Sequence, residues 1–111
     1  MLEEYTMEGK RKALDDKLRA ILGTSNVYFQ PPPSVRMNFP AIVYSLESEQ
    51  TVYADNLRYL VSENYELIVV DLNPDWADDL ARKILNEIPY SKRGTSYNLD
   101  GLTHIPILVH T

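Results

Sequence analysis

Two apolar runs, residues 41–46 (AIVYSL) and 65–72 (YELIVVDL), decide the fold of this 111-residue chain. Both are rich in the β-branched and aromatic residues that favour strands. The polar span between them contains a turn signal at 54–56 (ADN). This pattern predicts a long antiparallel hairpin. Its base belongs to a core sheet, and its distal part, residues 47–64, projects beyond that sheet as an arm.

The N-terminal part of the chain predicts a helix and then a short connection. Over residues 10–22 apolar side chains recur every three or four positions, as on one face of a helix, and Gly23 suits the position just after the helix end. Residues 27–30 form only a short extended run in this prediction. The three prolines at 31–33 fix φ and offer no N–H donor, so they predict a stiff spacer.

A second helix is predicted to begin at Asn73 and to end by Ile88. Asn73 can cap the helix, Pro74 suits the first helical position, and Asp75 is favoured at the positive end of the helix dipole. Pro89 disfavours helical geometry in the residue before it. The predicted apolar face, with the tryptophan in the core, consists of Trp76, Ala77, Leu80, Ala81, Ile84, Leu85 and Ile88.

The C-terminal part predicts a polar connection at 90–93, a strand at 95–99, a tight turn at 100–101 (DG) and a last strand at 102–109. Pro106 cannot donate to a sheet ladder, so it predicts that the last strand lies at a sheet edge or starts late. The fold class that follows is α+β, in the order α-β-β-α-β-β. Two helices pack on a mainly antiparallel four-stranded sheet with a long projecting hairpin.

Composition limits the classes of function. A chain of 111 residues predicts a single domain, residues 1–111. The net charge of −5 disfavours a protein that binds nucleic acid by neutralising phosphates. The absence of cysteine excludes disulfides and fits a reducing compartment. No apolar run is long enough to span a bilayer, and the acidic N-terminus is unlike a signal peptide, so a soluble, cytoplasmic protein without membrane contact is expected.

No pattern of residues predicts catalysis, a metal site or a cofactor. His104 and His110 lie on one face of the last strand but roughly 20 Å apart, too far to share a metal. Asp75, Asp78 and Asp79 have a simpler role in the first turn of the second helix. Asp71 ends a strand without a partner base nearby, which favours a bond to the following turn. We therefore expect a protein that is not an enzyme and binds no cofactor.

The arm is the candidate interaction surface. It is expected to be β-like, with a break or bulge at 47–50 and 63–64. A two-stranded ribbon needs a neighbour to pack against, and tyrosine is favoured at interfaces. Five of the eight tyrosines, Tyr28, Tyr44, Tyr53, Tyr59 and Tyr65, lie in or next to the hairpin region. The predicted subunit or partner interface consists of Glu47, Glu49, Thr51, Tyr53, Asp55, Asn56, Arg58, Tyr59, Lys92 and Arg93.

The order of several short segments resembles a family of small tailed-phage proteins. These segments are 26–32 (NVYFQPP), 37–44 (MNFPAIVY), the turn at 54–56, 69–75 (VVDLNPD) and 97–102 (YNLDGL). Together they are similar to tail-terminator or tail-completion proteins, which are related in fold to the tail-to-head joining proteins. The resemblance covers nearly all of residues 10–111 and rests on order and spacing.

This resemblance implies a structural virion protein without a catalytic site. It would form a ring, usually a hexamer, that caps the tail tube at the head-proximal end and joins it to the neck or head-completion protein. It would be made in the host cytoplasm and reside in the virion. The acidic balance suits a lumen through which DNA passes without adhering. The alternatives are another phage neck ring, such as a head-closure or adaptor protein, and an intracellular module that binds peptides along a sheet edge.

Overall fold

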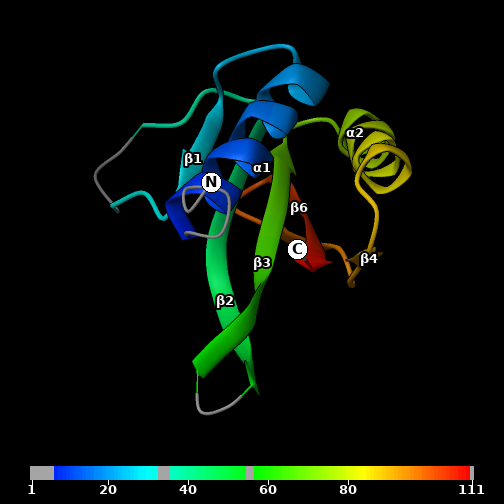
Figure 1. The fold of residues 1–111 in the computed structure, drawn as a ribbon. Helices are drawn as coiled ribbons and strands as arrows, with labels where there is room; N and C mark the ends of the chain where they lie inside the picture. The colour runs from blue at the N-terminus through cyan, green and yellow to red at the C-terminus, as the bar shows by residue number, and fades with distance from the viewer. Residues whose placement is uncertain (1–6, 33–35, 55–56, 111) are drawn as a thin grey trace.

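The computed structural model describes residues 7–32, 36–54 and 57–110, with side chains described within 11–32, 36–49 and 63–110. Over these residues the chain is an α+β protein in which two helices pack on a mixed six-stranded sheet (Figure 1). The elements are α1 (Met7–Leu22), β1 (Val27–Phe29), β2 (Ala41–Ala54), β3 (Leu57–Asp71), α2 (Pro74–Glu87), β4 (Ser91–Arg93), β5 (Tyr97–Leu99) and β6 (Leu102–His110).

The sheet differs from the predicted four-stranded antiparallel sheet in two short strands. Its order is β1-β2-β3-β6-β4, and β5 pairs with β6 beyond the end of β4. β1 is parallel to β2, whereas the other pairs are antiparallel. The predicted order α-β-β-α-β-β is therefore wrong. The extended run at 27–29 is a strand, and so is part of the predicted connection at 90–93, because each finds a longer strand to pair with.

The prediction that Pro106 marks a sheet edge is also wrong, because β6 lies between β3 and β4. Pro106 pairs with Ile68 of β3, while its carbonyl accepts a hydrogen bond of 2.8 Å from Gly94 N. The nitrogen and carbonyl of one strand residue point to the same side, so the missing N–H faces Gly94. Gly94 lies in the gap between β4 and β5, and the pairing with β3 loses no hydrogen bond.

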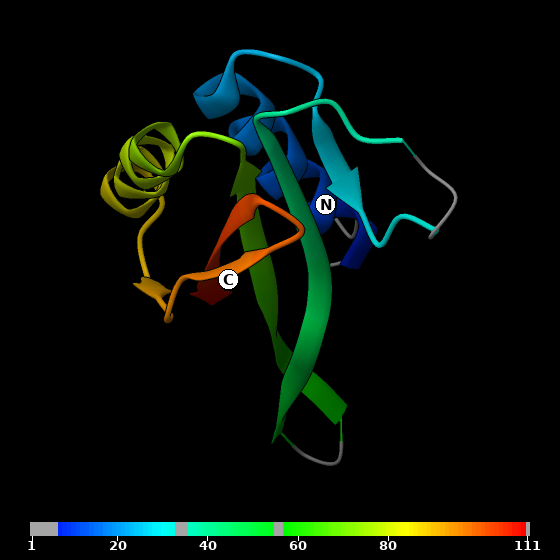
Figure 2. The same ribbon diagram turned by 180° about the vertical axis from the view of Figure 1, so that it is seen from behind.

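The hydrophobic core lies between the helices and one face of the sheet. Core side chains alternate along the central strands, as in Leu67 and Val69 of β3 or Ile105 and Ile107 of β6. Figures 1 and 2 show α1 in front of the sheet in one view and behind it in the other. Successive side chains of a strand point to opposite faces of the sheet, so the alternation of buried residues identifies the face that the helices cover.

The helix ends follow the predicted capping residues, and of the apolar face predicted for α2 only Trp76 was misassigned. Asn73 Oδ1 accepts hydrogen bonds from the backbone N–H groups of Asp75 (2.9 Å) and Trp76 (3.3 Å). Gly23, at φ 79°, follows α1 as predicted. Trp76 is 65% exposed, which contradicts its predicted place in the core. The buried residues of α2 are Ala77, Ala81 and Ile84, with Ile88 at its C-cap.

The hairpin of β2 and β3 contains two bulges, one on each strand. Leu46 pairs with Tyr65 and Ser48 with Asn64, so Glu47 is an extra residue on β2. This confirms the predicted bulge. A second register shift between Val52 and Tyr53 leaves Tyr59 as the extra residue on β3. Bulges bend a ribbon and increase its twist.

The arm makes the molecule elongated. Its principal extents are 51 × 26 × 23 Å, and its radius of gyration is 15.1 Å. A compact chain of this length has a radius of gyration of about 13 Å. Figures 1 and 2 show the hairpin extending past the ends of the other strands. The length of β2 and β3 therefore exceeds what the covered sheet requires.

Candidate interaction surface

The arm leaves the sheet where its neighbouring strands stop. The last pair of β1 with β2 joins Phe29 to Tyr44, and the last pair of β6 with β3 joins His110 to Asn64. Beyond these pairs, no strand among the described residues lies along either outer edge of the arm. Open edges present backbone N–H and carbonyl groups that can pair with another chain. The arm is thus a two-stranded ribbon with two open edges.

Two of the five tyrosines in or next to the hairpin region, Tyr44 and Tyr65, belong to the core. Tyr44 and Tyr65 are each 1% exposed, and their rings meet edge to face at 6.1 Å between centroids. The Tyr65 hydroxyl donates a hydrogen bond to the buried carboxylate of Glu63. Burial and this hydrogen bond raise the pKa of Tyr65 above its ordinary value. These residues anchor the base of the arm rather than present a contact surface.

A chain of polar contacts joins the bulge on β2 to the end of β6. Asn64 Nδ2 donates to Ser48 Oγ at 2.8 Å, and Asn64 Oδ1 lies 2.6 Å from His110 Nδ1. The backbone N–H of His110 donates to Tyr90 O at 3.1 Å. These contacts join the bulge of β2 to β3 and to the end of β6.

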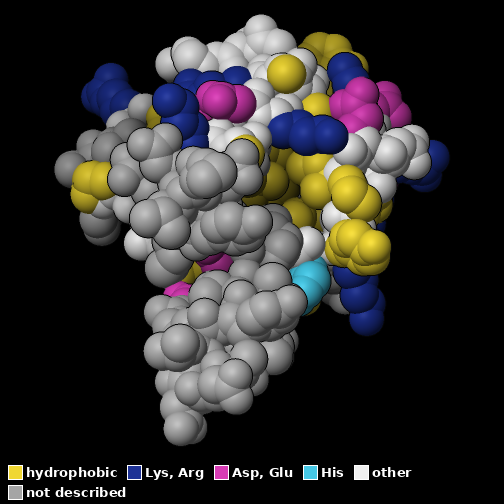
Figure 3. All heavy atoms as spheres, in the orientation of Figure 1, with side chains coloured by type: hydrophobic (Ala, Val, Ile, Leu, Met, Phe, Trp, Pro, Cys, Tyr) yellow, Lys and Arg dark blue, Asp and Glu magenta, His cyan; other side chains and the backbone are white. Residues whose placement is uncertain are grey.

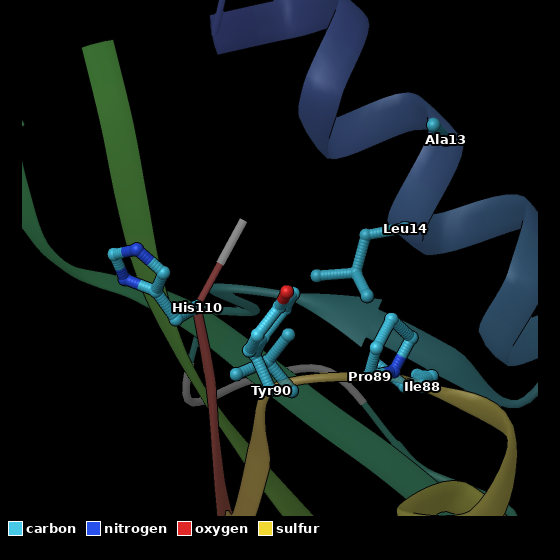
Figure 4. A pocket seen from close by; sticks show the side chains of 7 residues that line it. Ala13, Leu14, Ile88, Pro89, Tyr90 and His110 are labelled. Atoms are coloured by element: carbon cyan, nitrogen blue, oxygen red, sulfur yellow. The ribbon is translucent and has the colours of Figure 1, made fainter.

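An apolar recess lies between α1, the end of α2 and the end of β6. Its volume is about 450 Å³. Figure 4 shows Leu14 pointing from α1 toward Pro89 and Tyr90, with His110 on the opposite side of Tyr90. Figure 3 shows hydrophobic side chains gathered in this region, beside a histidine. The residues that line the apolar recess are Ala13, Leu14, Ile88, Pro89, Tyr90, Val109 and His110.

A second, more polar recess continues from the first toward the arm. The two share Tyr90, Val109 and His110, and the second has a volume of about 340 Å³. It brings Glu47 and Lys92, two of the predicted interface residues, into one site. The residues that line this polar recess are Glu47, Ser48, Asn64, Tyr90, Lys92, Leu108, Val109 and His110.

The two residues of the basic pair at 92–93 have different surroundings: Arg93 forms an ion pair, whereas Lys92 is exposed. It lies in β4, not in a loop as the sequence suggested. Arg93 Nη1 forms an ion pair of 2.5 Å with Asp78 of α2, whose other oxygen lies 2.9 Å from Arg82 Nε. The hydrogen bond from Arg93, together with both positive charges, holds the pKa of Asp78 below its ordinary value. Lys92 is exposed and forms no ion pair among the described residues.

The remaining predicted interface residues lie along the arm. Glu47 and Glu49 are exposed, and Glu49 pairs in register with Glu63. In the distal half the register joins Thr51 to Val61 and Tyr53 to Arg58. Tyr59 is the bulged residue of β3. Asp55 and Asn56 lie outside the described residues.

The apolar recess could not be predicted from the sequence, because its parts are distant in the chain. Tyr90 is 82% exposed and has a φ of 58°. This left-handed conformation costs a residue with a side chain roughly 1–2 kcal/mol. Such strain at an exposed aromatic residue points to a role other than stability.

The described residues provide little for other kinds of chemistry. They contain no cluster of three or more His, Asp or Glu side chains that could hold a metal. His104 stacks on Tyr97 with ring centroids 4.9 Å apart. Asp71 Oδ1 accepts a hydrogen bond of 2.7 Å from Leu72 N, as expected for a strand-end residue. Within the described part of the chain no helix has the length and apolarity to cross a membrane.

Comparison of the chain with protein-family models gave no match. A search of curated protein sequences likewise found no significant match.

Proposed function

We propose that this protein is a structural component of a bacteriophage tail. It forms a ring, a hexamer in the simplest case, at the head-proximal end of the tail. There it ends growth of the tail tube and joins the tail to the neck or head-completion protein. Its partners are copies of itself, the tube protein and the neck protein, and DNA passes through the ring without specific binding. It assembles in the host cytoplasm and remains in the virion.

The observation that carries this proposal is the arm. A two-stranded ribbon has marginal stability in water, yet β2 and β3 continue past the last pairs with β1 and β6. Its distal half contains Val52, Leu60 and Val61 among other apolar residues. A ribbon of this composition is favoured when a neighbouring molecule covers it. The resemblance of the chain to tail terminators supplies the identity of the assembly.

The charge of the chain supports a passage for DNA. With 16 acidic and 11 basic residues, the net charge is −5. A ring of six copies would carry a formal charge six times larger, which disfavours adhesion of the phosphate backbone to its lumen. We therefore expect assembled rings to show no measurable retention of duplex DNA at physiological salt.

A shortened arm tests the proposal. Glu49 and Glu63 face each other in register, so residues 50–62 can be replaced by an Asn-Gly turn that suits a two-residue hairpin. We expect this variant to fold. Its far-ultraviolet circular dichroism spectrum should still be that of a folded α+β protein. It should fail to form rings in the presence of tube protein, as observed by cryo-electron microscopy. Normal rings from the shortened chain would contradict the proposed role of the arm.

The alternatives predict different locations and partners. A neck ring would bind the head-closure or portal assembly but not isolated tail tubes. A peptide-binding module would remain monomeric and would be absent from purified particles. Incubation with purified tube protein and neck protein separately, followed by sedimentation, distinguishes the three. Co-sedimentation with tubes is the result expected for a tail terminator.

A further inference from the structure

Charge is distributed unevenly along the chain. Residues 10–36 contain six basic and two acidic side chains, whereas residues 71–79 contain four acidic side chains and no basic one. The first segment includes most of α1, and the second includes the N-terminal end of α2. A chain with a net charge of −5 therefore has one basic and one acidic region. Regions of opposite charge on one chain can meet in a contact between two copies.

The acidic region has an exposed apolar centre at the start of α2. Leu72 is 68% exposed and Trp76 is 65% exposed. Asp75 and Asp79 lie one helical turn apart beside Trp76. Both carboxylates are exposed, and neither forms an ion pair among the described residues. An apolar centre with a tryptophan and a charged rim is typical of a protein interface, and these four residues are called the Trp76 patch below.

The basic region adjoins the apolar recess. Ala13 belongs to the α1 wall of the recess (Figure 4). Lys12 precedes Ala13, and Lys17 follows it by one helical turn; both are exposed and form no ion pair within the described part of the chain. Asp16 is also exposed here, so the three exposed charges sum to one positive charge. The recess volume of about 450 Å³ has room for one large aromatic side chain.

We propose that the Trp76 patch of one copy binds at the apolar recess of a second copy. Trp76 enters the recess, and its two neighbouring carboxylates face Lys12 and Lys17 of α1. This inference rests on the proposed ring and names a contact that builds it. The same copy cannot make the contact with itself, because the patch begins α2 and the recess follows its end. This helix has 14 residues and a length of about 21 Å.

The contact is head-to-tail, since patch and recess are different surfaces. Each copy therefore offers its patch to one neighbour and its recess to the other. Such a contact produces a ring when its rotation closes and an open filament when it does not. It uses no residue of the arm, which remains available to the tube or neck protein.

Charge reversal in full-length chains tests the contact. The patch variant carries Asp75→Lys and Asp79→Lys, and the α1 variant carries Lys12→Glu and Lys17→Glu. Each variant alone brings like charges together, so we expect self-association in analytical ultracentrifugation to weaken about ten-fold or more. An equal mixture brings opposite charges together at every contact and should restore association to within about three-fold of the parent. Circular dichroism and thermal unfolding verify that both variants are folded.

The apolar centre of the contact is tested by a second pair of variants. Trp76→Ala removes the exposed indole and should weaken self-association about ten-fold or more. Tyr97→Ala is the control, because its ring is 46% exposed, stacks on His104 and belongs to neither the Trp76 patch nor the apolar recess. We expect this control to change self-association less than about two-fold. Equal effects of the two changes would overturn the proposed place of Trp76.

The outcomes separate this inference from the proposed function. All variants are also incubated with tube protein and viewed by cryo-electron microscopy. Normal rings from either charge variant alone would overturn the contact and leave the proposed function intact. A mixture that associates no better than its two components would overturn it as well. Normal self-association with lost binding to tubes would assign the Trp76 patch to the tube protein instead. A parent chain that stays monomeric with and without tubes would overturn both the contact and the proposed function.

Discussion

The Tyr44 hydroxyl on β2 donates a hydrogen bond of 2.5 Å to Asp15 Oδ2 on α1. The other carboxylate oxygen of Asp15 accepts from Arg19 Nε at 2.5 Å, and Arg19 donates in turn to the carbonyl of Val27 at 3.1 Å. One carboxylate thus connects the helix, the central hairpin and the parallel edge strand. This connection adds a side-chain contact at Val27 to the backbone pairing of β1 with β2.

Removal of the Tyr44 hydroxyl should weaken this connection without a change of volume in the core. Tyr44→Phe leaves Asp15 partly buried with one donor fewer, so we expect a loss of roughly 1–2 kcal/mol in the free energy of unfolding. Urea denaturation followed by circular dichroism measures it. Tyr28→Phe, at a half-buried tyrosine whose hydroxyl accepts an exposed bond from Asn38 N, is the control and should cost less. An equal loss in both variants would contradict the role of Asp15.

Acid should destabilise the protein through Asp15 and Asp78. Burial opposes ionisation of Asp15, but the hydrogen bonds from Tyr44 and Arg19 outweigh it, and its pKa lies below the ordinary value of 3.8. The pKa of Asp78 is lowered by Arg93 and Arg82. A carboxyl group with a lowered folded-state pKa stabilises the fold above its unfolded value and loses this effect as the pH falls through the folded value.

The free energy of unfolding should therefore be level near neutral pH and decline as the pH falls below about 4. Asp15→Asn should be less stable than the parent at pH 7 and should lose less on acidification. Thermal unfolding at several pH values between neutral and strongly acidic provides the measurement. Parallel pH curves for parent and variant would show that Asp15 contributes no such linkage.

The strained backbone of Tyr90 predicts an unusual response to glycine. Tyr90→Gly relieves the left-handed strain and removes a ring that is 82% exposed, so the free energy of unfolding should stay constant or rise by up to about 1 kcal/mol. Tyr97→Gly, at an exposed tyrosine within β5 whose ring stacks on His104, should instead lower it by about 1 kcal/mol. Chemical denaturation of the two variants tests the contrast. A clear loss at Tyr90 would mean that the ring stabilises the single chain.

Gly94 and Pro106 should behave as a coupled pair. A Cβ atom added to Gly94 would lie 3.0 Å from Pro106 Cγ, closer than normal contact. We expect Gly94→Ala to cost roughly 1–2 kcal/mol in the parent and much less in a Pro106→Ala background. A double-mutant cycle from urea denaturation gives the coupling. Additive effects would show that the alanine is accommodated without contact with the proline.

The sequence predicted those parts of the fold that depend on neighbouring residues. Asn73 caps α2, Gly23 follows α1, and the bulge at Glu47 occurs where the arm becomes polar. The turn at 100–101 also has the predicted form, with positive φ at both Asp100 and Gly101. Each of these features is determined by the chemistry of a few adjacent residues, which is why a single sequence suffices.

Features that depend on distant contacts were not predictable. β1 and β4 have three residues each, too few to show a period of two, and long partner strands define them. Trp76 was misplaced because hydropathy favours the larger side chain. Ala77 and Ala81, predicted on the same face, are fully buried, since small residues let the helix approach the core closely.

The candidate surface shows the same division between local and distant signals. The arm itself was predictable, because the span between the two apolar runs is long and contains further strand-forming residues at 51–53 (TVY). The apolar recess was not, because Leu14, Ile88 and Val109 are brought together only by the packing of α1 and α2 on the sheet. Tyr44 and Tyr65 show that counting tyrosines does not separate core from interface.

The two bulges of the hairpin shift the pairing register in opposite directions, but both increase the twist of the hairpin. Glu47 adds a residue to β2 and Tyr59 adds one to β3, so the pairing near the turn, Ala54 with Leu57, is the one an unbroken hairpin would have. Their contributions to right-handed twist add, because each bulge increases it. Deletion of both bulge residues, Glu47 and Tyr59, would therefore reduce the twist and change the orientation of the tip. The pairing of Ala54 with Leu57 would be kept. Related chains could aim the same arm at differently spaced neighbours in this way.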